Sequence, residues 1–230
     1  MWDSGRLVGF DTETTGVNPR QARIVTAAVV IRDHGDEVRT WLADPGVEIP
    51  AAAQAVHGIS TAYAREHGRP AAAVVAELAD TLERELRAGV PVVAFNAPYD
   101  LEILDRELAR HGLTPLSNRL PAIRPIIDPL VLDRALVAKR RGKRRLEDLL
   151  KHYQIPHSNA LHTAEVDVLA TLDLAGAIAR AYPRVAALDL DALHDYQVTA
   201  HRAWAEDFAR FLSSRRGEPV RVSPHWPLPR

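Results

Sequence analysis

The sequence predicts an α/β protein built in layers, and three observations support that prediction. β-like segments come first in the chain, and helical segments separated by short apolar strands follow them. This order is typical of helices packed on a sheet rather than of an all-α or all-β fold. Hydrophobic residues make up 47% of the 230 residues and charged residues 26%, the ordinary range for a globular domain. We therefore expect one domain of good size with a terminal extension.

The strands are predicted from β-branched runs and from alternation of polar and apolar side chains. The segment 7–13 begins with an apolar run, the segment 22–33 is rich in β-branched residues, and the segment 37–43 alternates. The turn-like DHGD at 33–36 joins the second strand to the third, so we expect an antiparallel meander. Two short strands are expected further along the chain, at 90–96 and 124–129.

The helices are predicted from apolar side chains at helical spacing, which the segment 70–88 shows clearly. Gly58 suits the end of an early short helix, and Pro98 suits the first turn of a later one. The expected helices cover 50–60, 70–88, 98–111, 129–138, 145–153, 163–181 and 189–215.

Charge and composition exclude several classes of protein. The formal net charge is −1, so the chain does not coat nucleic acid as a basic protein would, and any nucleic-acid contact needs a local patch. The absence of cysteine removes disulfides, thiolate metal sites and a cysteine nucleophile. The amino end has no signal-like pattern, and no apolar run approaches the roughly 18 residues of a membrane span. We therefore expect a soluble, cytoplasmic protein without membrane contact.

Four carboxylates stand where predicted strands end or predicted helices begin. Asp11 and Glu13 end the first strand, and because side chains alternate along a strand, they should point the same way. Asp100 falls in the first turn of one helix and Asp167 on the first turns of another. Alone, an acidic residue at a helix start has an ordinary explanation, since the helix dipole favours it. Together, the four mark the region where loops of an α/β fold converge on a site.

Carboxylates held side by side cost free energy unless positive charge lies between them. The short motifs around Asp11 and Asp100 contain no Arg or Lys. Oxygen ligands without thiolates suit Mg²⁺ or Mn²⁺, and two such ions about 4 Å apart form the clamp that hydrolyses phosphodiesters. The attacking water then needs a base. His162, on the loop before a predicted helix, has an ordinary pKa near neutrality and suits that role, although a lone histidine there is more often a surface residue.

At this point the chain resembles the DEDDh family of 3′→5′ exonucleases, which includes the epsilon proofreading subunit of bacterial DNA polymerase III. Its three exonuclease motifs are matched, in order, by FDTETTG (10–16), NAPYD (96–100) and HTAEVD (162–167). VHGIS (56–60) and GKRRLEDLLKHYQI (142–155) are similar to further family segments. The resemblance implies a ribonuclease-H-like fold, with a five-stranded mixed sheet flanked by helices. It makes residues 1–183 the exonuclease domain and residues 184–230 a C-terminal amphipathic helix with a Pro-rich tail.

The resemblance also implies a role for each acidic residue. Asp11, Glu13 and Asp167 would hold the metal ion that carries the attacking water. Asp11 would also touch a second ion, with Asp100 near it, and both ions would be Mg²⁺ or Mn²⁺. His162 would be the general base. The products would be nucleoside 5′-monophosphates.

Substrate contacts follow from the same resemblance. The partner would be a nucleic acid with a free 3′ end, and single-stranded DNA is the expected form. Thr14 and Thr15 would meet the terminal 3′-hydroxyl. His57 and Tyr99 would flank the terminal nucleotide, where the Tyr99 ring allows stacking on a base. Asn96 would order the loop that carries it.

Several alternatives stay open at this point. The substrate is DNA, in proofreading or repair, or else RNA with 3′ ends to be trimmed. A catalytically silent nucleic-acid-binding module is the third possibility, and the intact acidic set argues against it. The basic run KRRGKRR (139–145) either follows a phosphate backbone or forms a solvated loop. The apolar face of 189–215 should pack on the domain, but it could instead form a homodimer or bind a protein partner.

Overall fold

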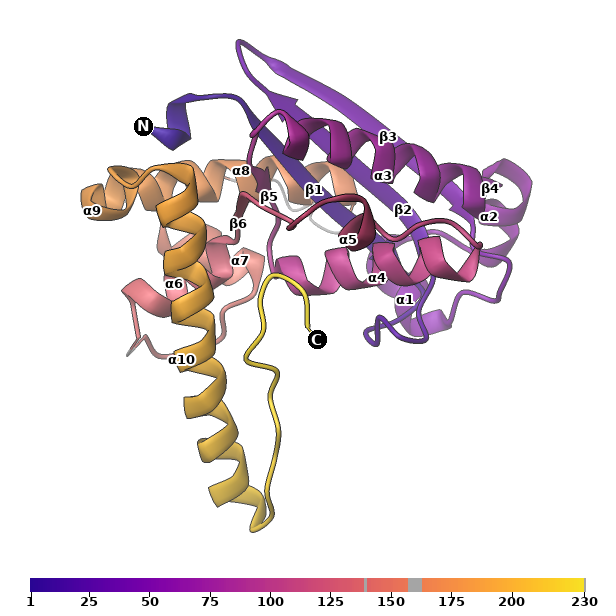
Figure 1. Ribbon diagram of the computed structural model, residues 1–230. Helices are drawn as coiled ribbons and strands as arrows, with labels where there is room; N and C mark the ends of the chain where they lie inside the picture. Colours follow the sequence, from indigo (N-terminus) through magenta and orange to yellow (C-terminus); the bar gives the residue numbers. More distant parts are fainter. Residues whose placement is uncertain (139, 157–162, 230) are drawn as a thin grey trace.

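The computed structural model describes residues 1–138, 140–156 and 163–229. Its centre is a six-stranded sheet in the order β4-β3-β2-β1-β5-β6, with helices on both faces (Figure 1). The predicted fold class, a mixed sheet flanked by helices with a helical extension at the carboxyl end, is confirmed.

Three long strands form the predicted antiparallel meander, namely β1 (Leu7–Thr14), β2 (Ile24–Arg32) and β3 (Asp36–Asp44). The two-residue strand β4 (Arg69–Pro70) lies parallel to β3. This sixth strand is absent from the five-strand expectation, because a strand of two residues, one of them proline, carries no alternation that a sequence pattern could reveal.

The other two strands extend the sheet beyond β1. Both β5 (Val92–Val93) and β6 (Ile126–Ile127) are parallel to their neighbours. They are shorter than predicted. Pro91 and Pro125 lie just before them, and proline has no N–H to donate to a ladder. β6 is therefore a short edge strand, and its outer side needs hydrogen-bond partners from elsewhere in the chain.

The helices agree with the prediction to within a few residues at each end. In chain order, after the short 3₁₀ turn Trp2–Ser4, they are α1 (Ala51–His57), α2 (Thr61–His67), α3 (Ala71–Arg87), α4 (Ala97–Arg110), α5 (Leu116–Arg119), α6 (Pro129–Leu136), α7 (Leu146–His152), α8 (Ala164–Ala181), α9 (Pro183–Ala186) and α10 (Leu190–Arg216). The short helices α2, α5 and α9 were not predicted, because one or two turns show little periodicity. In the part of the chain that the structure describes, no helix is long and apolar enough to cross a membrane.

The two faces of β1 point into different hydrophobic cores. Val8 and Phe10 belong to the core beneath α3 and α4, whereas Leu7 belongs to the core beneath α8. Gly9 lies on the α8 face, where a Cβ atom would lie only 2.4 Å from Val168. The missing side chain therefore lets α8 approach β1 closely. This alternation decides which helix each later residue of β1 can meet.

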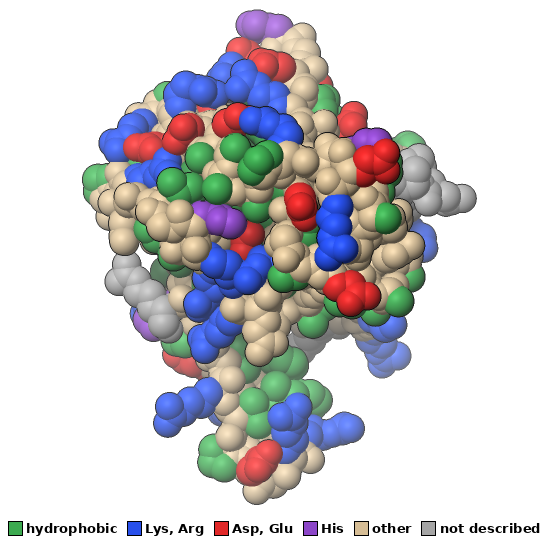
Figure 2. Space-filling view, turned by 90° about the vertical axis from the view of Figure 1, so that its right-hand side faces the viewer, with side chains coloured by type: hydrophobic (Ala, Val, Ile, Leu, Met, Phe, Trp, Pro, Cys, Tyr) green, Lys and Arg blue, Asp and Glu red, His purple; other side chains and the backbone are tan. Residues whose placement is uncertain are grey.

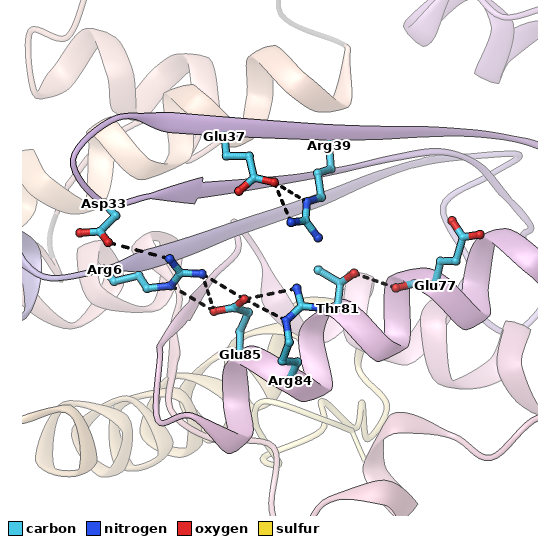
Figure 3. Close-up of polar contacts among 8 residues, drawn as sticks. All are labelled: Arg6, Asp33, Glu37, Arg39, Glu77, Thr81, Arg84 and Glu85. Atoms are coloured by element: carbon cyan, nitrogen blue, oxygen red, sulfur yellow. Dashed lines mark hydrogen bonds and ion pairs between the residues drawn. The ribbon is translucent and has the colours of Figure 1, made fainter.

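Ion pairs tie α3 to the amino end of the sheet (Figure 3). Arg6, just before β1, donates to Glu85 of α3 at 3.1 Å and lies 3.9 Å from Asp33 in the β2–β3 turn. Arg84 approaches the same Glu85 carboxylate at 3.3 Å. Because Glu85 is only 4% exposed, the two guanidinium groups compensate a carboxylate that is nearly buried. These contacts hold the end of β1 that is opposite to Asp11 and Glu13.

The C-terminal extension consists of α10 and a tail that folds back along it (Figure 1). The first half of α10 packs on the domain, as predicted, through Leu193, His194, Gln197, His201 and Ala205. Phe208 and Phe211, further along, are 37% and 54% exposed. Figure 2 shows hydrophobic side chains among Lys and Arg side chains on the narrow projection that the far end of α10 and the tail form. A protein partner for this projection stays a prediction.

The close approach of α8 to β1 predicts that Gly9→Ala destabilises the protein. The added methyl group overpacks the contact with Val168, so the free energy of unfolding should fall by about 1–3 kcal/mol. Urea unfolding measures this change. Gly35→Ala is the matched control, because a Cβ at Gly35 meets nothing within 4 Å. Equal stability of the two variants would contradict this account of the packing.

Candidate metal centre

The end of β1 presents two carboxylates on one face of the sheet. Asp11 and Glu13 follow Gly9 at alternate positions, so both side chains point the same way, as predicted, and the face they share is the one that α8 covers. Asp167 lies in the first turn of α8. One oxygen from each of the three carboxylates lies within 4.8 Å of the other two. Residues far apart in the sequence are therefore brought together because α8 packs across the carboxyl end of β1.

The fourth carboxylate, Asp100, comes from the other side of the sheet. Asp100 lies in the first turn of α4 and is 3% exposed. Its Oδ1 accepts hydrogen bonds from the Thr12 backbone N–H at 3.0 Å and from Thr12 Oγ1 at 2.6 Å. Thr12 stands between the two acidic residues of β1 and faces α4. Asp100 therefore lies next to the group of three carboxylates with one oxygen held by Thr12.

Burial and mutual repulsion raise the pKa values of these carboxyl groups. Burial raises the pKa of Glu13 to about 8, and the charges of Asp167 and Asp100 add to the rise. Burial also raises the pKa of Asp11, helped by the three carboxylates around it. Burial likewise raises the pKa of Asp100 to about 7, although the hydrogen bonds that Asp100 accepts from Thr12 oppose the rise. Without a cation, the site therefore holds protons near neutral pH.

The donor set fits a divalent metal ion. The three grouped residues offer carboxylate oxygens alone, which Mg²⁺ and Mn²⁺ prefer, and the chain contains no thiolate. A cation between Asp11, Glu13 and Asp167 would remove the repulsion that raises their pKa values. A cation bound in this group would thus supply the positive charge that the sequence motif lacks.

The loop after β1 is fastened to α4 by Tyr99. The Tyr99 hydroxyl donates to the Gly16 carbonyl at 2.5 Å and lies 2.6 Å from Thr14 Oγ1. Thr15 is 9% exposed, and its Oγ1 accepts from the Arg23 backbone N–H at 2.9 Å. The hydroxyl group of Tyr99 thus has a structural contact that sequence reasoning missed. The predicted stacking of its ring on a base stays a prediction.

His57 ends α1, where Gly58 adopts a left-handed conformation with φ 78°. Nδ1 of His57 accepts from the Ile59 backbone N–H at 3.1 Å, which leaves the proton on Nε2. Burial lowers the pKa of His57. Its Nε2 is buried and has no hydrogen-bond partner among the described residues. His57 and Glu13 line one cavity of 260 Å³, together with Trp41, Tyr63, Thr163 and Glu165 among others.

Motif two depends on a residue that sequence reasoning missed. Asn96 is exposed and has a left-handed backbone, with φ 63° and ψ 47°. The backbone N–H groups of Asn96 and Ala97 each donate at 3.0 Å to the carboxylate of Asp128, which is 1% exposed. The available signal was the Asp-Pro pair at 128–129, because Asp is a common residue just before a helix that starts with Pro. The Asp-Pro pair predicts the start of α6, but it does not predict that Asp128 accepts hydrogen bonds from Asn96 and Ala97.

His162 lies outside the described residues, so its position relative to the carboxylates stays a prediction. Lys139 of the basic run also lies outside them. Within the run, Arg140 and Arg144 contact the buried carboxylate of Asp133 in α6. Their charges are therefore part of the structure. Arg141, Lys143 and Arg145 are exposed, but Arg145 pairs with Glu147 at 2.6 Å. Arg141 and Lys143 are therefore the described residues of the run that are best placed to contact a phosphate backbone.

Comparison with known proteins gives matches over most of the chain. A family model described as Exonuclease matches residues 8–175. A DNA polymerase III subunit epsilon-like protein of Rhodobacter capsulatus is 35% identical over 179 residues, which are 74% of this chain and 23% of that protein. The DNA polymerase III subunit epsilon of Rickettsia conorii is 30% identical over 169 residues, which are 70% of this chain and 68% of that protein.

Solved structures of exonuclease I share the fold. One of them is 26% identical with a TM-score of 0.68, covering 86% of this chain and 44% of that chain. E. coli exonuclease I in complex with a dA16 oligonucleotide is 25% identical with a TM-score of 0.67, again covering 86% and 44%. The chain thus spans less than half the length of these exonuclease I chains and about a quarter of the Rhodobacter relative.

The raised pKa values predict that metal binding strengthens as the pH rises. Unfolded carboxyl groups titrate near pH 4, whereas Glu13 and Asp100 titrate near 8 and 7 in the folded protein. The folded, metal-free protein therefore holds extra protons, and these groups reduce its stability as the pH rises from about 4 to 8. A bound metal ion displaces the protons and reverses this loss. The melting temperature should therefore rise more on adding Mg²⁺ at pH 8.5 than at pH 6.

Differential scanning fluorimetry with and without Mg²⁺ measures these shifts. Asp11→Asn is the control variant, and its shift should be small at both pH values because it lacks one of the three carboxylate ligands. A shift in the wild-type protein that does not change between pH 6 and pH 8.5 would contradict the prediction.

Proposed function

Because the chain belongs to the exonuclease family, whose model matches residues 8–175, we propose that it removes nucleotides from the 3′ end of DNA by metal-assisted hydrolysis. The observation that carries the proposal is the group of three carboxylates, Asp11, Glu13 and Asp167, with oxygens within 4.8 Å of one another. Asp11 and Glu13 lie at the end of a buried strand and Asp167 in the first turn of the helix packed against it, so packing fixes the backbone of all three. The products would be nucleoside 5′-monophosphates.

Two divalent ions would act in this mechanism. Asp11, Glu13 and Asp167 would hold one of them, and Asp11 and Asp100 would lie beside the second. Bound there, the ions would supply positive charge that lowers the pKa of a water molecule and stabilises charge on the phosphate. The hydrogen bonds from Thr12 fix one oxygen of Asp100, and so orient the other oxygen relative to Asp11. The role of Thr12 is thus to position this carboxylate.

His162 is the proposed general base. It immediately precedes Thr163, the residue before α8, and Asp167 lies in the first turn of that helix. Thr163 and Glu165 line the cavity that Glu13 also lines, so the chain re-enters the described structure beside the carboxylates. A histidine there could take a proton from the attacking water near neutral pH.

The 3′ end of the strand would lie between the loop after β1 and the cavity beside His57. Thr14 and Thr15 would meet the terminal 3′-hydroxyl through their backbone and side chains. His57 offers an Nε2–H beside the Thr14 backbone, a donor suited to an oxygen or a base acceptor of the terminal nucleotide. Tyr99 would flank the same nucleotide while its hydroxyl fixes the loop, and Asn96 would order the start of α4.

Single-stranded DNA is the proposed substrate, in proofreading or repair. The relatives named as DNA polymerase III epsilon subunits and the exonuclease I complex with dA16 support DNA over RNA. RNA 3′ ends remain the second candidate. Arg141 and Lys143 would guide the strand by contacting phosphates. A homodimer or protein partner bound through the exposed part of 189–215 is a further possibility, for which Phe208 and Phe211 are the available apolar contacts.

A purified sample should shorten a 5′-labelled single strand stepwise when Mg²⁺ or Mn²⁺ is present, and EDTA should stop it. Asp167→Asn should lower the rate roughly a hundredfold or more, the usual scale for losing one electrostatic group at a reacting centre. Asp173→Asn on the same helix is the matched control, because Asp173 is half exposed and pairs with Arg32 instead. Gel assays of DNA and RNA strands side by side measure the rates. Absence of cleavage of either strand by the wild-type protein would refute the proposal.

Neutralising the exposed part of the basic run should weaken binding of a single strand. Arg141→Ala with Lys143→Ala should lower the slope of log K against log salt by about 1 for each phosphate that the run no longer neutralises. Fluorescence anisotropy with a labelled oligonucleotide measures the slope. Arg39→Ala is the control, because Arg39 lies on β3 and pairs with Glu37. An unchanged slope in the double variant would show that the run does not contact the strand.

A further inference from the structure

The edge strand β6 is covered by side chains of α10. The Ile126 backbone N–H donates to Nδ1 of His194 at 3.2 Å, and the Ile126 carbonyl accepts from Nε2 of Gln197 at 3.0 Å. The next outward N–H, that of Asp128, donates to Oε1 of Gln197 at 2.7 Å. Gln197 is 0% exposed. The C-terminal helix thus meets β6 as a neighbouring strand would, through side-chain groups.

The Asp128 carboxylate connects this edge to motif two. Its Oδ1 accepts from the N–H groups of Asn96 and Leu130, and its Oδ2 accepts from the N–H of Ala97. A buried carboxylate is stable only while such donors satisfy it. Asp128 therefore fixes the first residues of α4 and of α6 at the same time. Asp100 follows Asn96 by one helical turn, so its position depends on where Asp128 holds the start of α4.

The tail adds a side-chain contact to the same carboxylate. Trp226 is 5% exposed, and its Nε1–H points to Oδ2 of Asp128 at 3.4 Å. Its ring lies 5.0 Å from the ring of His194. The carbonyl of Ser223 lies 3.1 Å from Nε2 of His201, so the returning tail is held along α10 before it reaches the domain. Figure 1 shows this return from the far end of α10 to the region beside α4.

We propose that the C-terminal extension positions the second acidic motif: Gln197 and Trp226 hold Asp128, and Asp128 sets the start of α4 that carries Tyr99 and Asp100. Because this inference concerns catalysis, it rests on the proposed exonuclease function. The extension would then act on the rate without touching the substrate. Gln197, Trp226 and Asp128 are positioning residues in this account, and a loosened start of α4 would misplace Asp100 and the loop that Tyr99 fastens.

The test compares Trp226→Phe with Trp2→Phe in the full chain. Both substitutions remove a buried indole N–H, since Trp2 is 7% exposed and donates to the Val185 carbonyl at 3.1 Å in the other core. Trp226→Phe should lower kcat for single-stranded DNA roughly tenfold and raise the Mg²⁺ concentration for half-maximal rate, with KM for DNA little changed. Trp2→Phe should lower the melting temperature comparably and leave kcat near the wild-type value.

Hydrogen exchange gives a second readout that does not depend on activity. The peptide containing the Asn96 and Ala97 amides should exchange faster in Trp226→Phe than in the wild-type protein. In Trp2→Phe the same peptide should exchange at the wild-type rate. Gln197→Met keeps the side-chain volume and removes the hydrogen bonds of Gln197 to Asp128 and Ile126, so it should lower kcat and speed exchange of these amides as Trp226→Phe does. If these amides and kcat are unchanged in both Trp226→Phe and Gln197→Met, the inference is refuted. If the wild-type protein cleaves nothing, the exonuclease proposal fails, and the exchange data still decide whether the extension holds motif two.

Discussion

Carboxylates gathered at the end of β1 repel one another, and the packing around that strand holds them together against this repulsion. Asp11 and Glu13 leave the strand on the α8 face and meet Asp167 there. Thr12 leaves it on the α4 face and holds Asp100 by two hydrogen bonds. One strand therefore presents acidic groups drawn from both layers of helices. Such a group persists because two packed cores fix the backbone and because bound protons or a cation compensate the charge.

Sequence reasoning predicted the parts of the site that follow from local periodicity. Alternation along a strand was enough to place Asp11 and Glu13 together, and helix-start signals were enough for Asp100 and Asp167. Periodicity alone could not predict that three carboxylates form one group and that the fourth lies beside them, a division that only the family resemblance implied. That division arises because successive residues of β1 face different cores. Gly9 shows the same limit, since its role becomes visible only once α8 lies against it.

The contacts that hold the site were hidden from the sequence because they join segments far apart in the chain. Asp128 is separated by about thirty residues from the motif it anchors and by about a hundred from Trp226. The basic run shows a second limit, because a composition count treats its arginines alike. Arg144 faces a buried carboxylate of α6, whereas Arg141 is exposed, and only the tertiary structure separates a structural charge from one free to meet a phosphate.

The most direct test of the central claim is to locate a metal ion at the three carboxylates. Crystals of the protein soaked in Mn²⁺ would reveal the ion by its anomalous scattering. We expect a peak within bonding distance, roughly 2.0–2.3 Å, of oxygens from Asp11, Glu13 and Asp167 together. A fully occupied Mn²⁺ site elsewhere with none at these residues, or no bound ion at saturating Mn²⁺, would contradict it.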